Sequence, residues 1–192
     1  MIIETPAPDT AAGHAGEAFA HALAEFGVVP THVRVMEIDP GVHDAFEQLV
    51  RSIVPSIGVR LYELVTLAAA RALQSGHCLL AHGHKTLAAG IMDEPQLRRL
   101  AHDYRDADLT EAEIAAMGYA EMLSTDAAAM TDADSQALRD HGYSDQQILG
   151  ITLAAAARNF FSRSMLALAV PLEELPVLDA GTAAALLEPA RR

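Results

Sequence analysis

The sequence predicts an all-α fold, in which a single domain over residues 1–192 packs helices around an apolar core. Hydrophobic residues make up 51% of the chain and charged residues 20%, which excludes wholesale disorder and supplies enough apolar surface for a core. Apolar residues recur at helical spacing along almost the whole chain, and helix-capping residues precede several of these segments. Only residues 33–35 alternate with a period of two, and this segment is too short to predict a strand.

The first part of the chain contains two expected helices. Residues 1–14 carry two prolines and no periodic pattern, so we expect them to be loose. Residues 17–26 have apolar side chains at helical spacing and predict the first helix. The second helix begins with Asp39 as its N-cap and Pro40 at its first helical position, and its apolar stripe ends near Pro55.

The most apolar segment, about residues 60–90, predicts a central helical hairpin. Residues 61–73 form a strong helical pattern that contains almost no breaker. A serine and a glycine interrupt this pattern, and a second helix is expected over residues 77–89 with Ser75 as its N-cap. Because the turn is very short, the two helices are expected to lie side by side.

The second half of the chain predicts further helices, each marked at its start by a capping residue. Two of these starts are capping boxes, in which Thr or Ser is followed three residues later by Glu or Gln. The expected caps are Asp93, Thr110, Thr131, Ser144 and Thr182, and the corresponding helices end near Tyr104, Leu123, Gly142, Val170 and Leu187.

Two alanine-rich stretches of the chain are similar to each other. Residues 67–71 align with residues 154–158, and the alignment extends to several neighbouring positions. One interpretation is a duplicated helical unit, whose second copy at about 147–170 serves packing alone. The other is a chance similarity between two alanine-rich helices.

The charge and the cysteine content exclude several classes of function. The formal net charge is −13, and such a surface repels nucleic acid and anionic lipid, so we expect neither nucleic acid nor a membrane as a partner. No uncharged apolar run reaches about 18 residues, and no secretory signal pattern follows Met1. The single cysteine, Cys78, excludes an intramolecular disulfide and a multi-cysteine zinc site. We therefore expect a cytoplasmic protein, and the apolar composition favours a homo-oligomer.

The predicted hairpin places three reactive side chains near one another. Cys78 follows the expected cap by three residues, so its sulfur lies in the first helical turn, where the helix dipole favours a thiolate. His82 lies one turn further along the same face. Glu63 on the partner helix is level with this region, which predicts a line Glu63–His82–Cys78 with the histidine in the middle. A carboxylate that orients an imidazole beside a thiol is the general arrangement of an activated nucleophile.

Structural interpretations of the same residues remain open. A lone cysteine in an Ala/Leu-rich helix is often a small buried hydrophobic residue, and His82 can be a core histidine. Glu63 can be a structural partner of Arg158, because a buried arginine needs one. A soft metal ion is a further alternative, although two of its candidate ligands point apart on the helix; we expect no metal and no cofactor. The candidate ligands are His77, Cys78, His82 and His84.

The spacing of Glu63, Cys78 and His82 resembles the alkylhydroperoxidase D-like, or carboxymuconolactone decarboxylase, superfamily. The signature of that family is Glu-x(11)-Cys-x-x-Cys-x(3)-His, and these residues match its glutamate, its second cysteine and its histidine. His77 occupies a position that is often His or Tyr in the family. Flanking segments resemble the peroxidase-related branch, so that the resemblance covers about residues 25–171; these segments are residues 109–123, 138–148 and 158–163.

The sequence departs from the family signature at Ser75, which stands where the first cysteine is expected. In members with both cysteines, one thiolate attacks the peroxide and the other resolves the sulfenic acid as a disulfide. Ser75 cannot form that disulfide. The resemblance therefore leaves three alternatives: a one-cysteine hydroperoxide reductase with an external thiol reductant, a non-redox decarboxylase-like enzyme acting on a small carboxylate with His82 as acid/base, or an inactive oligomeric scaffold.

The hydroperoxide reductase is the function that we expect from the resemblance. In it Cys78 is the attacking thiolate, His82 shuttles the proton, Glu63 orients His82, and His77 is an auxiliary donor. The substrate would be a small hydroperoxide, and the family's assembly implies a homo-oligomer.

Overall fold

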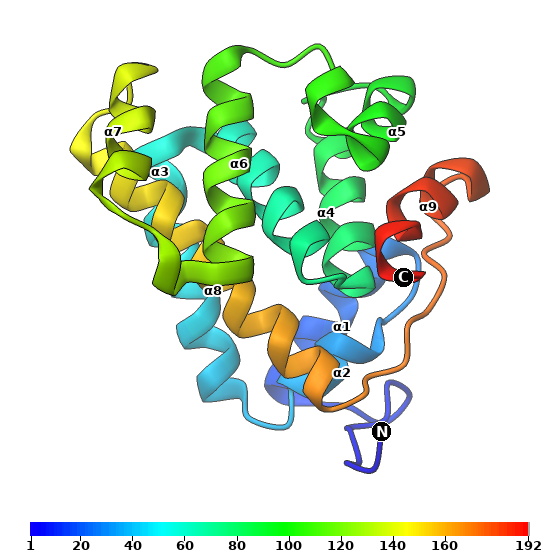
Figure 1. Ribbon diagram of the computed structural model, residues 1–192. Coiled ribbons are helices and arrows are strands. Elements are labelled where there is room, and N and C mark those ends of the chain that lie inside the picture. The colour runs from blue at the N-terminus through cyan, green and yellow to red at the C-terminus, as the bar shows by residue number, and fades with distance from the viewer. Residues whose placement is uncertain (192) are drawn as a thin grey trace.

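The computed structural model describes residues 1–191, and these residues form α-helices and short 3-10 turns without a strand (Figure 1). The prediction of an all-α fold is confirmed. The helices are α1 (Gly13–Phe26), α2 (Thr31–Met36), α3 (Pro40–Ala72), α4 (Gly76–Ala88), α5 (Glu94–His102), α6 (Glu111–Asp126), α7 (Asp132–Asp140), α8 (Asp145–Ala167) and α9 (Ala180–Leu187).

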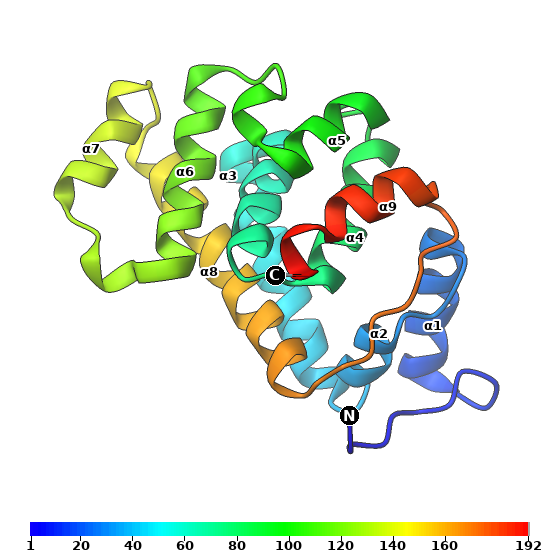
Figure 2. The same cartoon turned by 45° about the vertical axis from the view of Figure 1, so that its right-hand side comes forward.

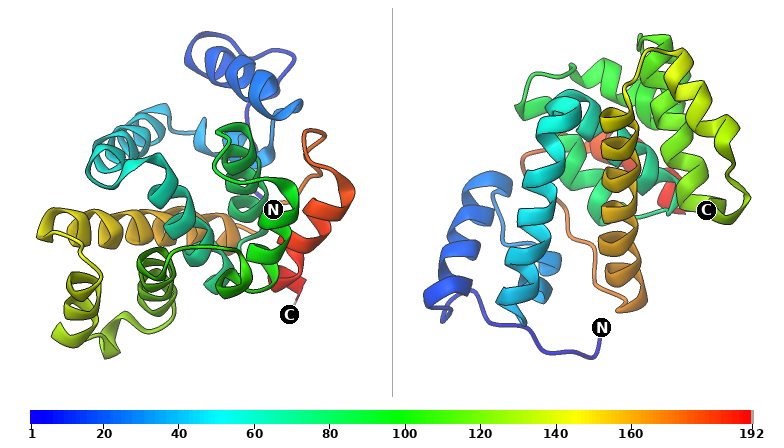
Figure 3. Two further views of the ribbon diagram at one scale, coloured as in Figure 1. Left: turned by 90° about the horizontal axis from the view of Figure 1, so that it is seen from above. Right: turned by 90° about the vertical axis from the view of Figure 1, so that its left-hand side faces the viewer.

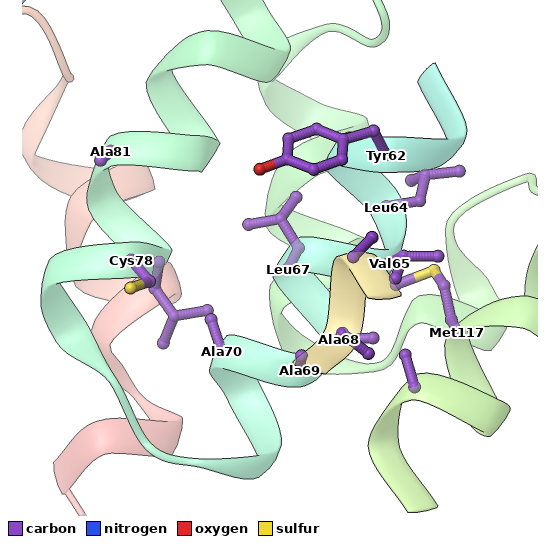
Figure 4. Close-up of a cluster of buried hydrophobic side chains, with 14 of the residues drawn as sticks. Tyr62, Leu64, Val65, Leu67, Ala68, Ala69, Ala70, Cys78, Ala81 and Met117 are labelled. Carbon is purple, nitrogen blue, oxygen red and sulfur yellow. The ribbon is translucent and has the colours of Figure 1, made fainter. Parts of the chain in front are cut away.

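The long helix α3 lies at the centre of the fold and packs against α8, α6 and α4 (Figures 1 and 3). Its C-terminal half is buried on all sides, which explains why that stretch of sequence is apolar all round rather than amphipathic. In Figure 4, Leu64 and Leu67 of α3 lie in the same buried cluster as Met117 of α6 and Cys78 of α4.

Helix α3 differs from the prediction in its first half. The apolar stripe ends near Pro55, but the helix continues through Pro55 and breaks at Gly58. Gly58 has φ 78° and ψ 158°, a conformation that glycine adopts without the steric cost of a side chain. The helix that precedes the bend and the one that follows it are the two that the sequence predicts, joined through this residue.

The apolar character of α3 also bears on the expectation that no segment crosses a membrane. Among residues 1–191, α3 is the one helix whose length and composition would allow a span, with a mean hydropathy of 1.4 in its most apolar window. Of that window, 61% is buried inside the protein, a pattern that core helices share, so the helix is weak evidence for a span.

The central helical hairpin of α3 and α4 forms as predicted, with a turn at residues 73–75. Gln74 has φ 56°, and Ser75 N donates to Ala70 O at 2.9 Å, which closes the turn. Gly76 begins α4 where a Cβ atom would lie 2.9 Å from a side-chain carbon of Leu172, so only glycine fits without a shift. Ser75 occupies the N-cap position, but its side chain makes no capping hydrogen bond and its Oγ is buried without a partner.

Most of the predicted caps are formed by side-chain hydrogen bonds. Those at Asp39, Asp93, Thr110, Thr131 and Ser144 are confirmed. The cap predicted at Thr182 is wrong: Asp179 caps α9 by accepting from Gly181 N and Thr182 N. Helix α9 then packs on α4 and α5 (Figure 2).

Residues 33–35, the segment with a period of two, belong to the short helix α2. The first backbone N–H of this helix, at Thr31, donates to the carboxylate of Glu173, and the Thr31 hydroxyl contacts the same carboxylate. Glu173 lies in the segment between α8 and α9, so a residue distant in sequence caps α2. Of residues 1–14, expected to be loose, residues 1–12 lie outside any helix, although Arg34 Nε donates to Pro6 O, whereas residues 13 and 14 begin α1.

The two similar alanine-rich stretches are not followed by similar structures. The turn at residues 73–75 aligns with residues 160–162, which lie inside the unbroken helix α8. The interpretation that the second copy serves packing alone is also wrong, because two side chains of α8 contact the sulfur of Cys78.

Candidate active site

A cavity of about 520 Å³ lies among α1, α2, α3, α4 and the C-terminal part of α8. Much of its lining is apolar and aromatic, and includes Phe26, Phe46 and Phe161. The four side chains that the sequence singles out as catalytic all line this cavity: Glu63, His77, Cys78 and His82. Arg158, Tyr62 and His32 line it as well.

Glu63 and His82 form a direct hydrogen bond across the hairpin. Nδ1 of His82 donates to Oε2 of Glu63 at 2.7 Å, and both side chains are buried. Since a carboxylate only accepts hydrogen bonds, this contact places the ring proton on Nδ1 and leaves Nε2 with a free lone pair. The prediction that Glu63 orients the imidazole is consistent with this contact.

The charges of this pair follow from burial and from Arg158. Burial and the Arg158 guanidinium lower the pKa of His82 to about 4, although Glu63 acts in the opposite direction. Burial disfavours the charge of Glu63, but His82 together with the cations Lys85 and Arg158 outweighs it and holds the pKa of the carboxyl below its usual value. At neutral pH the pair therefore consists of a carboxylate and a neutral imidazole, which can act as a general base.

Cys78 lies in the first turn of α4 and is 2% exposed. Its sulfur accepts hydrogen bonds from the Ser162 hydroxyl at 3.1 Å and from Nη1 of Arg158 at 3.5 Å. Within residues 1–191 no hydrogen bond joins the sulfur to His82, whereas Glu63 and His82 are hydrogen-bonded to each other. The reason is geometric: side chains one turn apart begin about 5–6 Å from each other, and the sulfur is hydrogen-bonded to side chains of α8 instead.

Arg158 is the site residue whose position the sequence did not predict. It is 4% exposed, and Nη2 donates to the Tyr62 hydroxyl at 3.3 Å, while Nε is buried without a partner. The expected alternative, a pairing with Glu63, is not formed. Burial opposes the charge on Arg158, but the neighbouring Cys78 and Tyr62 outweigh it and raise the pKa of the guanidinium above its usual value. The only signal in the sequence was a charged residue within an alanine-rich helix.

His77 lies beside His32 in the cavity wall. Nε2 of His77 donates to Pro171 O at 3.0 Å, and its Nδ1 is buried without a hydrogen-bond partner. His32, which no motif in the sequence marks, meets the His77 ring edge-on at a centroid distance of 5.8 Å. Burial and His77 lower the pKa of His32 to about 3.

No group of three His, Cys, Asp or Glu side chains lies close enough to hold a metal ion in the part of the chain described, residues 1–191. The four candidate ligands of the sequence analysis have separate partners. The Cys78 sulfur accepts a hydrogen bond from α8, His82 is hydrogen-bonded to Glu63, and His77 is hydrogen-bonded to a backbone carbonyl. The ring of His84 packs against Phe26.

A second histidine–carboxylate cluster lies near the start of α3, and its members His14, His43 and Asp44 line the same cavity. Nδ1 of His14 donates to Oε2 of Glu37 at 2.8 Å, and the other ring nitrogen contacts Asp44 at 3.0 Å. His43 Nδ1 contacts the second oxygen of Glu37 at 2.5 Å. These contacts raise the pKa of His14 to about 9, with the hydrogen bonds to Glu37 and Asp44 as the main causes. The cluster links α1 to the beginning of α3.

The sequence matches no family model and no curated protein. Solved structures do match the fold. The apo debrominase Bmp8 is 21% identical, with 98% of each chain covered and a TM-score of 0.77. A peroxidase-related protein from Ralstonia eutropha JMP134, described as an alkylhydroperoxidase AhpD core, is 18% identical over 98% of this chain and 95% of that one, with a TM-score of 0.74.

A peroxidase-related protein from Silicibacter sp. TM1040 is 22% identical over 88% of this chain and 90% of that one, also with a TM-score of 0.74. At such identities a structural match establishes the fold and leaves the activity to be argued from the site. The chain therefore has the alkylhydroperoxidase D-like helical fold.

Proposed function

We propose that this protein is a thiol-dependent hydroperoxide reductase that uses one cysteine, Cys78, and an external thiol reductant. The observation that carries the proposal is the 2.7 Å hydrogen bond between Glu63 and His82 in a cavity that Cys78 also lines. A nucleophile, a base with a fixed tautomer and an apolar cavity for an organic group are together what this reaction requires.

In the first step the Cys78 sulfur attacks the O–O bond of the hydroperoxide. A bond forms between the thiolate sulfur and the terminal oxygen, the O–O bond breaks, and the thiolate and ROOH become a sulfenate and ROH. His82 takes the proton of the attacked hydroperoxide oxygen at Nε2 and passes it to the departing alkoxide oxygen. Because the sulfur and His82 are not hydrogen-bonded to each other, the hydroperoxide itself or a water lies between them in this step.

In the second step an external thiol restores Cys78. One thiol displaces water from the sulfenic acid and forms a mixed disulfide, and a second thiol releases the oxidised reductant as a disulfide. The chain has no other cysteine, and Ser75 has no sulfur to offer. In this proposal the protein acts in the cytoplasm, where such thiols are supplied, and as a homo-oligomer.

The test of the proposal is the capture of the sulfenic acid. Purified protein is treated with hydrogen peroxide or with an organic hydroperoxide in the presence of dimedone, and the adduct at Cys78 is measured by mass spectrometry. Turnover with dithiothreitol is followed in parallel, with Cys78→Ala as the control. An adduct and Cys78-dependent turnover support the proposal, while the absence of an adduct with both peroxides overturns it.

The non-redox enzyme remains a second candidate, because the cavity contains a buried Arg158 that can hold a small carboxylate beside the neutral His82. The variant Cys78→Ser separates the two. It would leave acid–base chemistry on a carboxylate largely intact and abolish peroxide turnover. The inactive scaffold is favoured by the low exposure of Cys78 and disfavoured by the cavity and by the bonding of Glu63 to His82 rather than to an arginine.

The debrominase neighbour adds a substrate class to the assay. A cysteine-to-alanine variant of Bmp8, which is 22% identical to this chain with a TM-score of 0.75 over 96% of both chains, is seen in complex with 2,3,4-tribromopyrrole. Three phenylalanines, Phe26, Phe46 and Phe161, line the cavity here and offer surfaces for a flat ring. Release of bromide from a brominated pyrrole, driven by added thiol and dependent on Cys78, would favour reductive dehalogenation over peroxide reduction.

A further inference from the structure

We infer that Arg158, assisted by Ser162, holds the sulfur of Cys78 as a thiolate, and that Arg158 is therefore a positioning residue for the nucleophile. The catalytic consequence rests on the proposed function, but the charge state of the sulfur does not, and it is measurable without any peroxide.

The first support is that two donors from one helix converge on the sulfur. Ser162 and Arg158 are one turn apart on α8, and both donate to Sγ of Cys78, at 3.1 and 3.5 Å. A neutral thiol is a weak acceptor, whereas a hydrogen bond from a guanidinium to an anion is charge-assisted and stronger. A site that directs a cation and a hydroxyl at one sulfur is therefore suited to an anionic sulfur.

The second support is the charge balance around Arg158. Its guanidinium is 4% exposed, and its hydrogen-bond partners are Cys78 and Tyr62 rather than a carboxylate. A buried cation needs negative charge nearby. The Glu63 carboxylate supplies part of it, since Arg158 helps to lower the pKa of Glu63, but the hydrogen bond of that carboxylate goes to His82. Of the two groups that are hydrogen-bonded to the guanidinium, a thiol ionises far more readily than a phenol, so Cys78 is the counter-ion in direct contact.

The third support is that the nearby histidine does not supply the cation. Burial and Arg158 keep His82 neutral at neutral pH, so an imidazolium–thiolate pair is not the resting state. The N-terminal turn of α4 adds a favourable helix dipole to the effect of Arg158. The other titratable and charged groups that line the cavity come from every element around it: His14, Glu17, His21 and Glu25 on α1, His32 on α2, His43, Asp44, Glu47, Tyr62 and Glu63 on α3, and His77 and Lys85 on α4.

The test measures the thiolate directly. The absorbance of a thiolate near 240 nm, taken as the difference between wild type and Cys78→Ala, is followed from pH 5 to pH 10. We expect the signal to be present already at neutral pH. In Arg158→Gln we expect the transition to move to alkaline pH and the rate of Cys78 alkylation at pH 7 to fall about tenfold or more, which is the effect of losing one charge-assisted hydrogen bond.

Two comparison variants separate this role from a merely structural one. Arg158→Lys keeps the charge and is expected to retain part of the neutral-pH thiolate signal, and His82→Gln is expected to shift the titration far less than Arg158→Gln does. Circular dichroism and thermal melting verify that each variant is folded. Absence of a thiolate signal at pH 7 in the wild type overturns the inference, a measurement that needs no arginine variant.

An equal shift in the His82→Gln and Arg158→Gln variants also overturns the inference, because the base rather than the arginine would then govern the sulfur. Failure of the proposed function would give a different result. If Arg158 holds a thiolate but that thiolate forms no sulfenic acid with peroxide, the reductase is refuted and the role of Arg158 stands.

Discussion

Two histidine–glutamate contacts in the protein have nearly the same geometry, but their histidines have opposite charge states. His82 meets Glu63 at 2.7 Å and His14 meets Glu37 at 2.8 Å, each through Nδ1 and Oε2. The pKa of His82 is lowered to about 4, whereas that of His14 is raised to about 9. At neutral pH one contact joins a carboxylate to a neutral base, and the other is an ion pair.

The surroundings of the two rings explain this difference. The side chain of His82 is 7% exposed and lies near the buried guanidinium of Arg158, which disfavours a second positive charge. The side chain of His14 is 41% exposed, and Asp44 contacts its second nitrogen. The same hydrogen bond thus joins a carboxylate to a neutral imidazole at the hairpin and forms a charged helix-to-helix contact at α1.

The largest expected effect separates the two glutamates. Glu63→Gln removes the carboxylate that fixes the His82 tautomer, and we expect peroxide reduction to fall by about 10²-fold or more. The matched variant Glu37→Gln breaks the contacts of His14 and His43, and is expected to lower the melting temperature while leaving the rate within a few-fold of wild type. Steady-state kinetics and thermal melting measure both. Equal losses of rate would mean that the two contacts do not differ in function.

The second prediction concerns stability in acid. Because the pKa of His82 is lowered in the folded state, its contribution to the free energy of unfolding is fully present above about pH 6.5. This contribution is lost as the pH falls through about 4. His32 contributes in the same direction. The loss is expected to be on the order of 3 kcal/mol for His82. Urea titrations at pH 7, 5.5 and 4 measure it, and the pH dependence should be shallower in His82→Gln; an unchanged slope would contradict the low pKa.

The third prediction tests the cause that distinguishes His82 from His14. Arg158 lowers the pKa of His82, so Arg158→Gln should raise that pKa, and His14, whose pKa is set mainly by Glu37 and Asp44, should titrate as before. NMR titration of the imidazole resonances reports both values in one experiment. If the His82 resonance does not move, burial alone sets its charge state and Arg158 has no part in it.

The smallest expected effect is at the exposed ring. The pKa of His14 is raised, so its contribution to stability is fully present below about pH 6.5 and is lost as the pH rises through about 9. Since the ring is largely exposed, solvent and salt screen the contact, and His14→Gln should change the melting temperature only slightly at pH 7. Melting curves at pH 7 and pH 10 check this. The small difference in melting temperature between wild type and His14→Gln at pH 7 should vanish at pH 10.

What the sequence predicted correctly is set by local interactions. Caps such as Thr110 and Ser144 satisfy backbone groups within their own first turn, and the short turn before α4 forces α3 and α4 together. The contact between Glu63 and His82 follows from that hairpin, so the sequence could indicate it. Where two capping residues compete within one short segment, as Asp179 and Thr182 do, the local pattern does not decide between them.

The tertiary structure decided which groups touch the sulfur. Cys78 was predicted to face His82, but its hydrogen-bond partners are Arg158 and Ser162. These two residues of α8 lie 80 and 84 residues further along the chain. The capping of α2 by Glu173 is a contact of the same kind. By itself the sequence determined an all-helical fold with a glutamate–histidine pair, because periodicity, caps and short turns act over a few residues. The packing of α8 on the hairpin determined the charges around the thiol, because burial and contacts between distant residues exist only in the folded chain.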